Sequence, residues 1–127
     1  RDFAVKHAVF VVLKGAQTIV SGPDGFVFVN TTGNSGMATG GSGDVLTGVI
    51  AGIFGRNFRE VSVLGNPAEN RRAEPESVSE ILQYSVYLHG LAGDLAAVDI
   101  GETGLIASDI AAYLGRAATD LNPPDSV

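Results

Sequence analysis

A short glycine-rich stretch is the part of this sequence best suited to chemistry on a charged ligand. Residues 39–44 read Thr-Gly-Gly-Ser-Gly-Asp and run directly into a segment with helical hydrophobic spacing. The first N–H groups of a helix lack partners within the helix, and the helix dipole adds partial positive charge there. Glycines let those amides approach an anion closely. We call residues 39–44 the glycine turn and predict that it binds nucleotide phosphates.

Asp44 stands at the head of that helix and has two interpretations. As a capping or first-turn acid it would contribute about 0.5–2 kcal/mol to stability. Beside a phosphate site, a carboxylate is a poor phosphate ligand but a suitable general base for a hydroxyl that attacks the phosphate. The glycine turn is not a Walker A motif, because no Gly-Lys-Ser/Thr follows it. It is not a Rossmann fingerprint, because no Gly-x-Gly-x-x-Gly follows directly on a strand.

A second candidate for phosphate binding is the segment Lys14-Gly15-Ala16-Gln17-Thr18, which follows an apolar run at its carboxyl end. In open α/β sheets, ligands bind beyond the carboxyl ends of the strands, so Lys14 could reach a phosphate there. Taken alone, a lysine at a strand end is more often a solvated side chain. The segment therefore indicates phosphate binding only when it is considered together with the glycine turn.

Three apolar runs predict the strands that position these residues. Residues 8–13 form a continuous β-branched run, which predicts a strand buried on both faces. Residues 18–21 and 26–29 predict two further strands, and the turn signal at residues 23–25 (Pro-Asp-Gly) joins them into a hairpin. Residues 30–43 are rich in glycine and small polar residues, and we expect a loop.

Three helices are expected after the loop. The first starts at Asp44, and its two glycines, Gly48 and Gly52, hint at close packing against another backbone. Residues 77–98 form the second helix, for which Ser77 and Glu80 provide a capping-box signature. Residues 104–118 form the third. The side chains expected to face inward are Val45, Leu46, Val49, Ile50 and Ile53; Ile81, Tyr84, Leu88, Leu91 and Leu95; and Leu105, Ile106, Ile110, Ala111 and Leu114.

The order of elements and the composition favour a portion of a larger α/β domain. A hairpin and one strand are too few to cover three helices, so we expect more strands before Arg1. The polar residues 56–76 read as an exposed connection. Hydrophobic residues make up 45% of the 127 positions and charged residues only 17%, which suggests that part of the surface is buried against other structure.

Charge and cysteine content exclude several classes of function. The net charge of −6 argues against a general nucleic-acid role, because phosphate backbones require clustered Lys and Arg. The absence of cysteine excludes disulfides, thiolate metal sites and a cysteine nucleophile, and it fits a reducing compartment. No apolar run is long enough to span a bilayer, and no signal peptide is visible. We expect a cytoplasmic protein without membrane or nucleic-acid partners.

Three motifs together resemble one family. Residues 13–18 (Leu-Lys-Gly-Ala-Gln-Thr), residues 30–48 around the glycine turn, and residues 89–94 (His-Gly-Leu-Ala-Gly-Asp) occur in this order. The chain is similar in these motifs to the ADP/ATP-dependent NAD(P)H-hydrate dehydratases, metabolite-repair enzymes of the ribokinase-like superfamily. The resemblance spans about Val11 to Leu114 and covers roughly the C-terminal half of that domain.

The resemblance implies a three-layer α/β/α fold with a central, mostly parallel sheet, of which residues 1–127 are a C-terminal portion. It implies ADP or ATP as phosphoryl donor, with Mg²⁺, and the S epimer of hydrated NADH or NADPH as substrate. Phosphoryl transfer to the C6 hydroxyl and loss of phosphate would restore the nicotinamide cofactor. It also implies a homo-oligomer and leaves open whether an epimerase domain is fused to the chain or associated with it.

The resemblance also assigns roles to residues. Asp44 would bind the substrate and act as the catalytic base on its hydroxyl, and no residue is assigned to a metal. Independently of the resemblance, His89 is expected to be a packed or capped helix side chain, and Asp94 is expected to bond a neighbouring backbone. The nucleotide would be bound by Lys14, Gly15, Ala16, Gln17, Thr18, Asn30, Met37, Thr39, Gly40, Gly41, Ser42 and Gly43.

Two other functions are compatible with the sequence. A ribokinase-like kinase acting on a hydroxyl of a vitamin precursor or sugar would use the same glycine turn and the same base. Residues 34–38, which precede the glycines, favour the dehydratase over this kinase. A non-catalytic module that keeps the nucleotide-binding half as an interaction piece would also explain the high apolar content.

Overall fold

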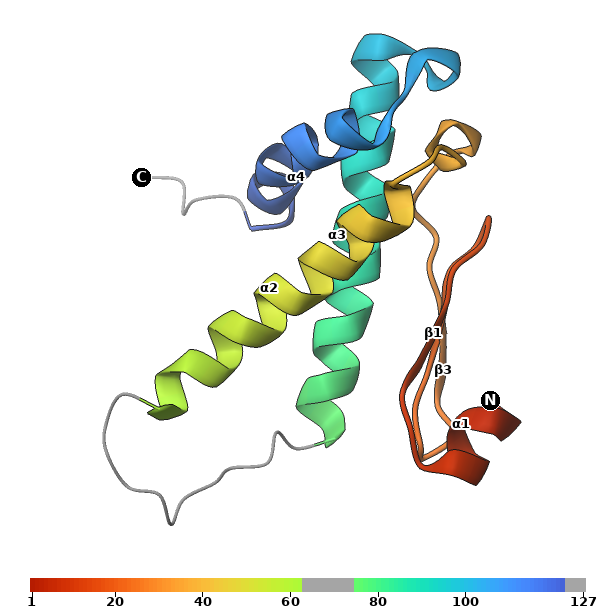
Figure 1. Cartoon of the computed structure of the whole chain (residues 1–127), viewed down its shortest axis with the longest axis vertical. Helices are drawn as coiled ribbons and strands as arrows, with labels where there is room; N and C mark the ends of the chain where they lie inside the picture. Colours follow the sequence, from red (N-terminus) through yellow and green to blue (C-terminus); the bar gives the residue numbers. More distant parts are fainter. Residues whose placement is uncertain (63–74, 123–127) are drawn as a thin grey trace.

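Three short strands form one antiparallel sheet, and helices pack against one of its faces (Figure 1). The computed structural model describes residues 1–62 and 75–122, and the side chains of residues 1–56 and 78–122. In chain order, the elements are α1 (Asp2–His7), β1 (Val11–Leu13), β2 (Ile19–Ser21), β3 (Val27–Val29), the 3-10 turn η1 (Ser35–Met37), α2 (Ser42–Ser62), α3 (Pro75–Ile100), the 3-10 turn η2 (Glu102–Gly104) and α4 (Ala107–Leu121).

The register of the sheet separates an inner face from an outer face. Val12, Val20 and Phe28 stand opposite one another across β1, β2 and β3, and all three pack into one apolar cluster with α2 and α3. The next row, Leu13, Ile19 and Val29, lies on the outer face because successive strand residues point to opposite sides. The predicted hairpin of the second and third strands is confirmed.

The prediction for residues 8–13 was wrong in two respects. The strand begins only at Val11, because α1 ends with Ala8 in a left-handed conformation (φ 52°) and the chain reverses there. The strand is not buried on both faces, since 62% of the Leu13 surface is exposed. A continuous apolar run predicts burial by some neighbour, and the neighbour of the outer face is not among the described residues.

Helix α2 begins at Ser42, two residues earlier than predicted. Of its predicted inward residues, Leu46 and Val49 are buried. The described residues do not show the close packing hinted at for Gly48 and Gly52, because a Cβ added at either glycine would meet none of their atoms within 4 Å. Both glycines lie on an open side of the helix.

Replacing Gly48 by alanine is therefore expected to stabilise the protein. The substitution removes backbone freedom from the unfolded chain and adds no steric conflict in the folded one. We expect the free energy of unfolding to rise by about 0.5–1 kcal/mol, measured by chemical denaturation. A decrease would contradict the open position of Gly48 in α2.

Helix α3 is the central element and contacts α2, α4, β2 and η1. Leu82 and Val86 face the sheet, while Leu88, Ala92 and Ala96 face α4 and η1, so the helix is buried on more than one side. The prediction of one apolar stripe on this helix was wrong for this reason. Tyr84, which was predicted to face inward, is exposed. The predicted capping box falls on Ser77, whose side chain lies outside the described part.

Helix α4 packs against α3 through a narrower face than the sequence predicted. Leu105, just before the helix, and Ile110 and Ala117 within it are buried. Ile106 and Ala111 were predicted to face inward, but both are exposed. The capping contact between the Ile106 N–H and the Asp109 carboxylate (3.0 Å) fixes Ile106 as the boundary residue, which turns its side chain outward.

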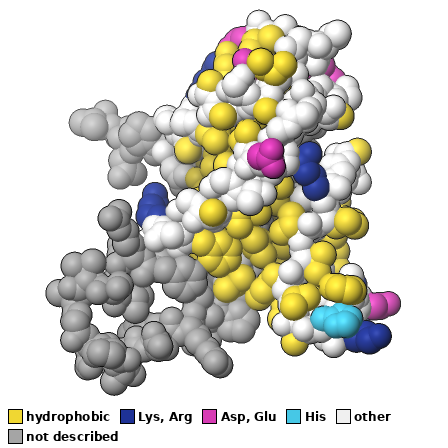
Figure 2. All heavy atoms as spheres, viewed as in Figure 1, with side chains coloured by type: hydrophobic (Ala, Val, Ile, Leu, Met, Phe, Trp, Pro, Cys, Tyr) yellow, Lys and Arg dark blue, Asp and Glu magenta, His cyan; other side chains and the backbone are white. Residues whose placement is uncertain are grey.

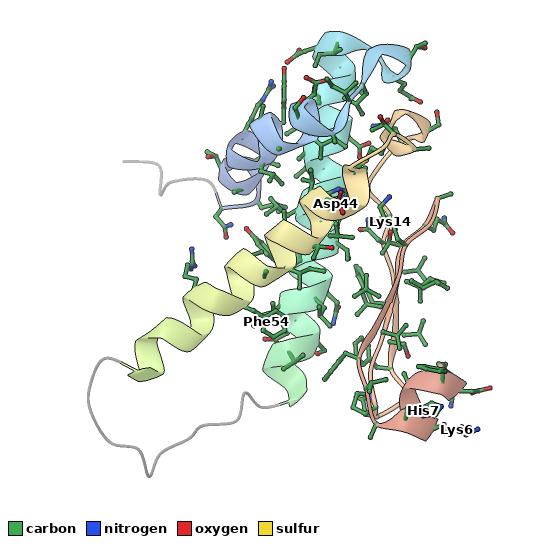
Figure 3. The ribbon with its side chains drawn as sticks, in the orientation of Figure 1. Lys6, His7, Lys14, Asp44 and Phe54 are labelled. Atoms are coloured by element: carbon green, nitrogen blue, oxygen red, sulfur yellow. The ribbon has the colours of Figure 1, made fainter. Side chains whose placement is uncertain are left out.

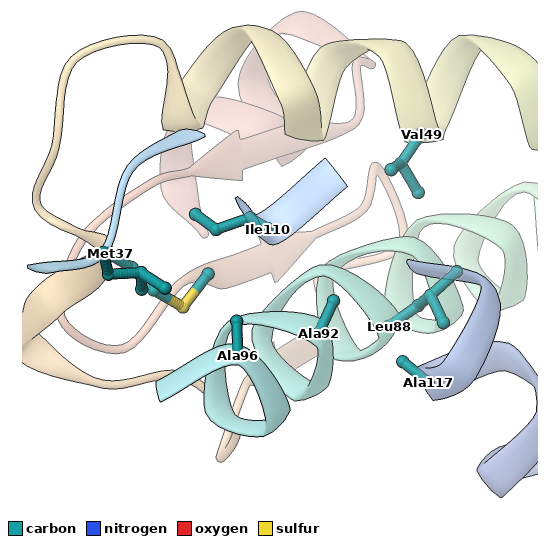
Figure 4. Close-up of a cluster of buried hydrophobic side chains, with 8 residues drawn as sticks. Met37, Val49, Leu88, Ala92, Ala96, Ile110 and Ala117 are labelled. Atoms are coloured by element: carbon teal, nitrogen blue, oxygen red, sulfur yellow. The ribbon is translucent and has the colours of Figure 1, made fainter. Parts of the chain in front are cut away.

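Two apolar clusters hold these elements together. One lies between the sheet, α2 and α3 and includes Val20, Leu46, Leu82 and Val86. The other joins η1, α2, α3 and α4 (Figure 4), and its buried members are Met37, Val49, Leu88, Ala92, Ala96, Leu105, Ile110 and Ala117. Both clusters contain α3, so this helix connects the sheet to the C-terminal helix.

The architecture is α/β, as predicted, with the helices α2 and α3 over one face of the strands. The three strands pair only in antiparallel fashion, so the described part contributes no parallel pair to the sheet that the resemblance implies. Among the helices that the structure describes, none is long and apolar enough to cross a membrane.

Candidate nucleotide and substrate site

A cavity of about 560 Å³ opens between the end of β1, the loop after β3 and helix α3. It is large enough for much of a nucleotide-sized ligand. Many of the predicted site residues line it, together with others that were not predicted. The lining consists of Lys14, Gly15, Ala16, Thr18, Asn30, Thr32, Gly33, Asn34, Ser35, Met37, Ala38, His89 and Gly90.

The glycine turn lies beside this cavity and presents free backbone donors. The N–H of Ser42 donates to the Thr39 carbonyl (3.3 Å), and the N–H of Asp44 donates to the Gly41 carbonyl (3.0 Å). The N–H groups of Gly40, Gly41 and Gly43 have no acceptor within residues 1–62 and 75–122. Three unpartnered amides at the start of α2 are what an anion site requires.

Gly41 is the position in this turn that requires glycine. Its φ is +87°, in the left-handed region, and a Cβ there would lie 3.1 Å from the Ala107 Cβ at the start of α4. The Ser42 hydroxyl points inward: it is buried and has no hydrogen-bond partner in the described part of the chain. In this conformation Ser42 offers no free donor to an anion, because its hydroxyl is buried and its N–H donates to the Thr39 carbonyl.

Lys14 reaches over the glycine turn from the end of β1. A Cβ at Gly43 would lie 3.7 Å from the Lys14 Cδ and 3.9 Å from its Cε. Figure 3 shows Lys14 beside the first turn of α2, and Figure 2 shows a basic and an acidic group close together over the same place. The two segments that the sequence singled out thus meet in space, and the exposed Lys14 side chain lies beside Gly43, one of the three residues with a free amide.

Asp44 is in the first turn of α2, and its carboxylate is exposed. It caps no backbone N–H among the described residues, so the capping interpretation has no hydrogen bond to support it. The dipole of α2 still favours a carboxylate there. An exposed carboxylate one residue from the free Gly43 amide is well placed to meet a second ligand beside a bound phosphate.

Asn30 and Met37 line the cavity but are also structural. The Asn30 side chain is buried, and its Nδ2 donates to the carbonyls of Thr32 (3.0 Å) and Val86 (3.2 Å). Met37 is buried in the cluster around Ala92 and Ala96. Ligand contacts from these two residues are therefore restricted to the edges that face the cavity. Gln17 is exposed and does not line it.

Helix α3 fixes the loop that lines the cavity, and the sequence did not predict this role of the helix. The Asp94 carboxylate accepts from the Gly33 N–H (2.8 Å) and from the Asn34 Nδ2 (2.9 Å). Gly90 and Gly93 let the loop approach, because a Cβ on Gly90 would overlap Thr32 and one on Gly93 would overlap the Met37 side chain. The expectation that Asp94 bonds a neighbouring backbone is confirmed.

A methyl group at Gly90 is expected to be costly. Its nearest neighbours include the Thr32 backbone carbon at 2.7 Å, which cannot move without shifting the loop. We expect Gly90→Ala to lower the free energy of unfolding by about 1–3 kcal/mol, the opposite sign to Gly48→Ala. Denaturation curves of the two variants in parallel would check this, and equal effects would contradict the close approach of the loop to α3.

A bound Mg²⁺ would have few protein ligands at this site. Within the described residues no group of three or more His, Asp or Glu side chains could hold a metal ion. Mg²⁺ commonly keeps several waters and binds through one or two carboxylates and substrate phosphates. The described site fits a Mg²⁺ that would be held mainly by nucleotide phosphates and waters.

The comparison with known proteins decides the family. A sequence model of the NAD(P)H-hydrate dehydratases matches residues 1–116. The chain belongs to the NAD(P)H-hydrate dehydratase family. The chain is 41% identical over 116 residues to the bifunctional NAD(P)H-hydrate repair enzyme of Thermofilum pendens, covering 91% of this chain and 19% of that enzyme. It is 37% identical over 102 residues to the ADP-dependent (S)-NAD(P)H-hydrate dehydratase of Neisseria meningitidis serogroup B, covering 80% of this chain and 28% of that enzyme.

The structural comparison agrees with the family. An ADP/ATP-dependent NAD(P)H-hydrate dehydratase of Bacillus subtilis, co-crystallised with ATP and Mg²⁺, superposes with a TM-score of 0.76 at 29% identity, over 96% of this chain and 38% of that chain. The ribokinase-like α/β fold predicted from the sequence is thereby confirmed. The chain spans less than two fifths of the length of that relative.

Proposed function

We propose that residues 1–127 are the C-terminal part of one NAD(P)H-hydrate dehydratase domain, and that the complete domain restores NADH and NADPH from their S-hydrated forms. One observation carries the proposal. In a chain of this family, the free amides of the glycine turn, the Lys14 side chain and the exposed Asp44 carboxylate meet beside one cavity. The free amides and Lys14 can bind the phosphates of a phosphoryl donor, and Asp44 beside them can meet the hydroxyl of an acceptor.

The outer face of the sheet supports the placement of this chain within a larger domain. Leu13, Val27 and Val29 are each more than 40% exposed on that face. Figure 2 shows further hydrophobic surface between α2 and the strands on the visible side. Apolar surface of this kind marks a site that is covered in the complete protein. The rest of the domain, which accounts for most of the length of the relatives, covers it.

The nucleotide lies with its phosphates at the free amides of Gly40, Gly41 and Gly43. Lys14 neutralises phosphate charge, and a short, oriented set of amides adds hydrogen bonds without a second basic side chain. The remainder of the nucleotide contacts Gly15, Ala16, Gln17, Thr18, Asn30, Met37 and Thr39. Mg²⁺, when bound with the nucleotide, neutralises charge on the transferred phosphoryl group.

Asp44 acts on the second ligand. Its carboxylate accepts the proton of the C6 hydroxyl as that oxygen forms a bond to the terminal phosphorus, and the bond from phosphorus to the donor nucleotide breaks. Phosphate then leaves with the electrons of its bond to C6. Loss of a proton from the neighbouring ring carbon forms the double bond of the reduced nicotinamide. Hydrate and nucleotide are thereby converted to NAD(P)H, inorganic phosphate and the shortened nucleotide.

The dehydratase function also leads to proposals for the compartment, the oligomeric state and the partners of the protein. The protein works in the cytoplasm on small molecules, as a homo-oligomer, without nucleic-acid or membrane partners. The net charge of −6 and the absence of cysteine are consistent with this setting. An epimerase that supplies the S epimer is fused or associated, and the bifunctional name of the Thermofilum pendens relative supports such an arrangement.

The direct experiment is to incubate the complete polypeptide with S-hydrated NADH and either ADP or ATP, and to follow the return of NADH. We expect NADH to form only when nucleotide and Mg²⁺ are present. Failure with both nucleotides would overturn the dehydratase proposal. A stable phosphorylated product from a small alcohol would favour a kinase instead. Absence of nucleotide binding by calorimetry would favour a non-catalytic module.

A further inference from the structure

His89 is a buried polar residue that the proposed reaction does not use. It lies on α3 and only 5% of its surface is exposed. Its Nε2 is 3.0 Å from the carbonyl oxygen of Ser42, which is 47 residues away in the chain. A carbonyl oxygen can only accept, so the Nε2 carries the hydrogen and donates it. The first residue of α2 is thus tied to α3 by one buried hydrogen bond.

Within the described part of the chain, the other hydrogen bonds of the glycine turn stay inside the turn and the start of α2. The N–H groups of Asp44 and Val45 donate to the Gly41 carbonyl, and the Ser42 N–H donates to the Thr39 carbonyl. Among the described residues, the bond from His89 is the one hydrogen bond that joins the turn to another element. The Ser42 hydroxyl has no partner among the described residues. A glycine-rich segment gains conformational freedom easily, so its free amides stay aligned only if something holds the backbone. The hydrogen bond from His89 supplies that restraint.

The charge state of His89 suits a positioning role. Burial lowers the pKa of its imidazole, and the nearby Lys14 charge lowers it further, although the bond to Ser42 acts in the opposite direction. The ring is therefore neutral near pH 7, because the ordinary histidine pKa is already about 6.5. A neutral imidazole still has one N–H to donate, so the bond to the Ser42 carbonyl is kept in this charge state.

The same stretch of α3 also holds the opposite wall of the cavity. Asp94 binds Gly33 and Asn34, while Gly90 and Gly93 allow the loop to lie directly on the helix. Residues 89–94, which the sequence singled out without a function, thus contact both the cavity wall and the glycine turn. One rigid helix sets the distance between these two parts of the site.

We propose that His89 is a positioning residue, which holds the glycine turn in register with the cavity wall that Asp94 fixes. The inference rests on the proposed function for its kinetic consequence, but its structural consequence can be measured without any turnover. Removing the donor frees the start of α2 to move. Misplacement of reacting groups by about 1 Å can lower a rate on the order of 100-fold.

The test compares three variants of the complete protein: His89→Leu, His89→Gln and Ser85→Ala. Leucine removes the donor, whereas the glutamine amide nitrogen can donate from nearly the position of the histidine Nε2. Ser85 is a matched control, since it is buried on the same helix but bonds only to Ile81 of its own helix. Amide hydrogen exchange at residues 40–46 and steady-state kinetics with saturating and limiting nucleotide are the two readouts.

We expect His89→Leu to speed exchange of the hydrogen-bonded amides of Ser42, Asp44 and Val45 within this stretch. It should also lower kcat/KM for the nucleotide on the order of 100-fold. His89→Gln and Ser85→Ala should leave exchange there close to that of the parent protein. Unchanged exchange in His89→Leu overturns the inference. Equal loss of activity in the Leu and Gln variants, with normal exchange in the Gln variant, would instead make His89 a direct participant and also overturn it.

Two further outcomes separate this inference from the proposed function. A parent protein that does not dehydrate the hydrate contradicts the proposed function, but the exchange measurement still decides the role of His89. If His89→Leu does not fold, His89→Asn replaces it. The asparagine side chain remains polar, but its amide nitrogen lies too close to α3 to reach the Ser42 carbonyl, so the same loss of protection is expected.

Discussion

Asp44→Ala is expected to lower kcat of the complete enzyme by about 10²–10⁴-fold, the contribution typical of a positioned general base. The dissociation constant of ADP or ATP should stay nearly unchanged, because the carboxylate is exposed and Asp44 is not among the residues that line the cavity. Steady-state kinetics and calorimetry on one preparation would measure both quantities. The split between turnover and binding is the signature of a group that acts on the second ligand.

Asp44→Asn is the matched variant. It keeps the size and polarity of the side chain but cannot accept the hydroxyl proton, so we expect turnover close to that of the alanine variant. If the asparagine variant kept normal turnover, Asp44 would not be the base. If the alanine variant lost nucleotide binding and turnover together, the carboxylate would belong to the nucleotide site or to the fold.

Gly43→Val has the second largest expected effect and acts on binding. A Cβ at this position makes only an ordinary contact with Lys14, at 3.7 Å, so the free protein tolerates the substitution. The branched side chain would, however, occupy the space between the Lys14 chain and the Gly43 amide. Loss of one charge-assisted hydrogen bond to phosphate should raise the dissociation constant of the nucleotide about 10- to 100-fold.

Gly48→Val is the control for this effect. It lies in the same helix and faces open space, so it carries the same cost of a β-branched residue in a helix without approaching the site. Gly41 is less informative, because its φ of +87° means that any side chain there strains the fold. Normal nucleotide binding by Gly43→Val would contradict the anion site at the glycine turn.

The sequence predicted the parts of the site that local patterns specify. A glycine run before a helical pattern implies free amides at a helix start, and the structure has three of them at Gly40, Gly41 and Gly43. The meeting of Lys14 with Gly43 also followed from the resemblance to the family. The roles of these residues toward nucleotide and substrate are still predictions.

Long-range contacts explain most of what the sequence did not predict. Nothing near His89 in the chain indicates that its ring bonds Ser42, since the two residues lie on different helices and are 47 positions apart in the sequence. Likewise, periodicity predicts one buried face for α3, whereas tertiary packing buries residues toward both the sheet and α4. Asn30 and Met37 each make structural contacts and also line the cavity. Local sequence cannot distinguish a structural role from a ligand contact at such positions.

The apolar run at residues 8–13 shows a different limit of prediction from sequence. It predicted a strand buried on both faces, but the strand begins only at Val11, and 62% of the Leu13 surface is exposed. A run of apolar residues indicates burial but does not say which partner covers the surface, or whether that partner is a neighbouring element.

The most direct test of the proposed reaction is its stoichiometry in the complete polypeptide. Purified S-hydrated NADPH is supplied with limiting ADP or ATP, and inorganic phosphate and NADPH are quantified together. The proposed mechanism predicts one phosphate for each NADPH formed, no conversion of the R epimer, and no product from Asp44→Asn. A phosphorylated compound that accumulates without release of phosphate, or NADPH that forms without consumption of nucleotide, would contradict it.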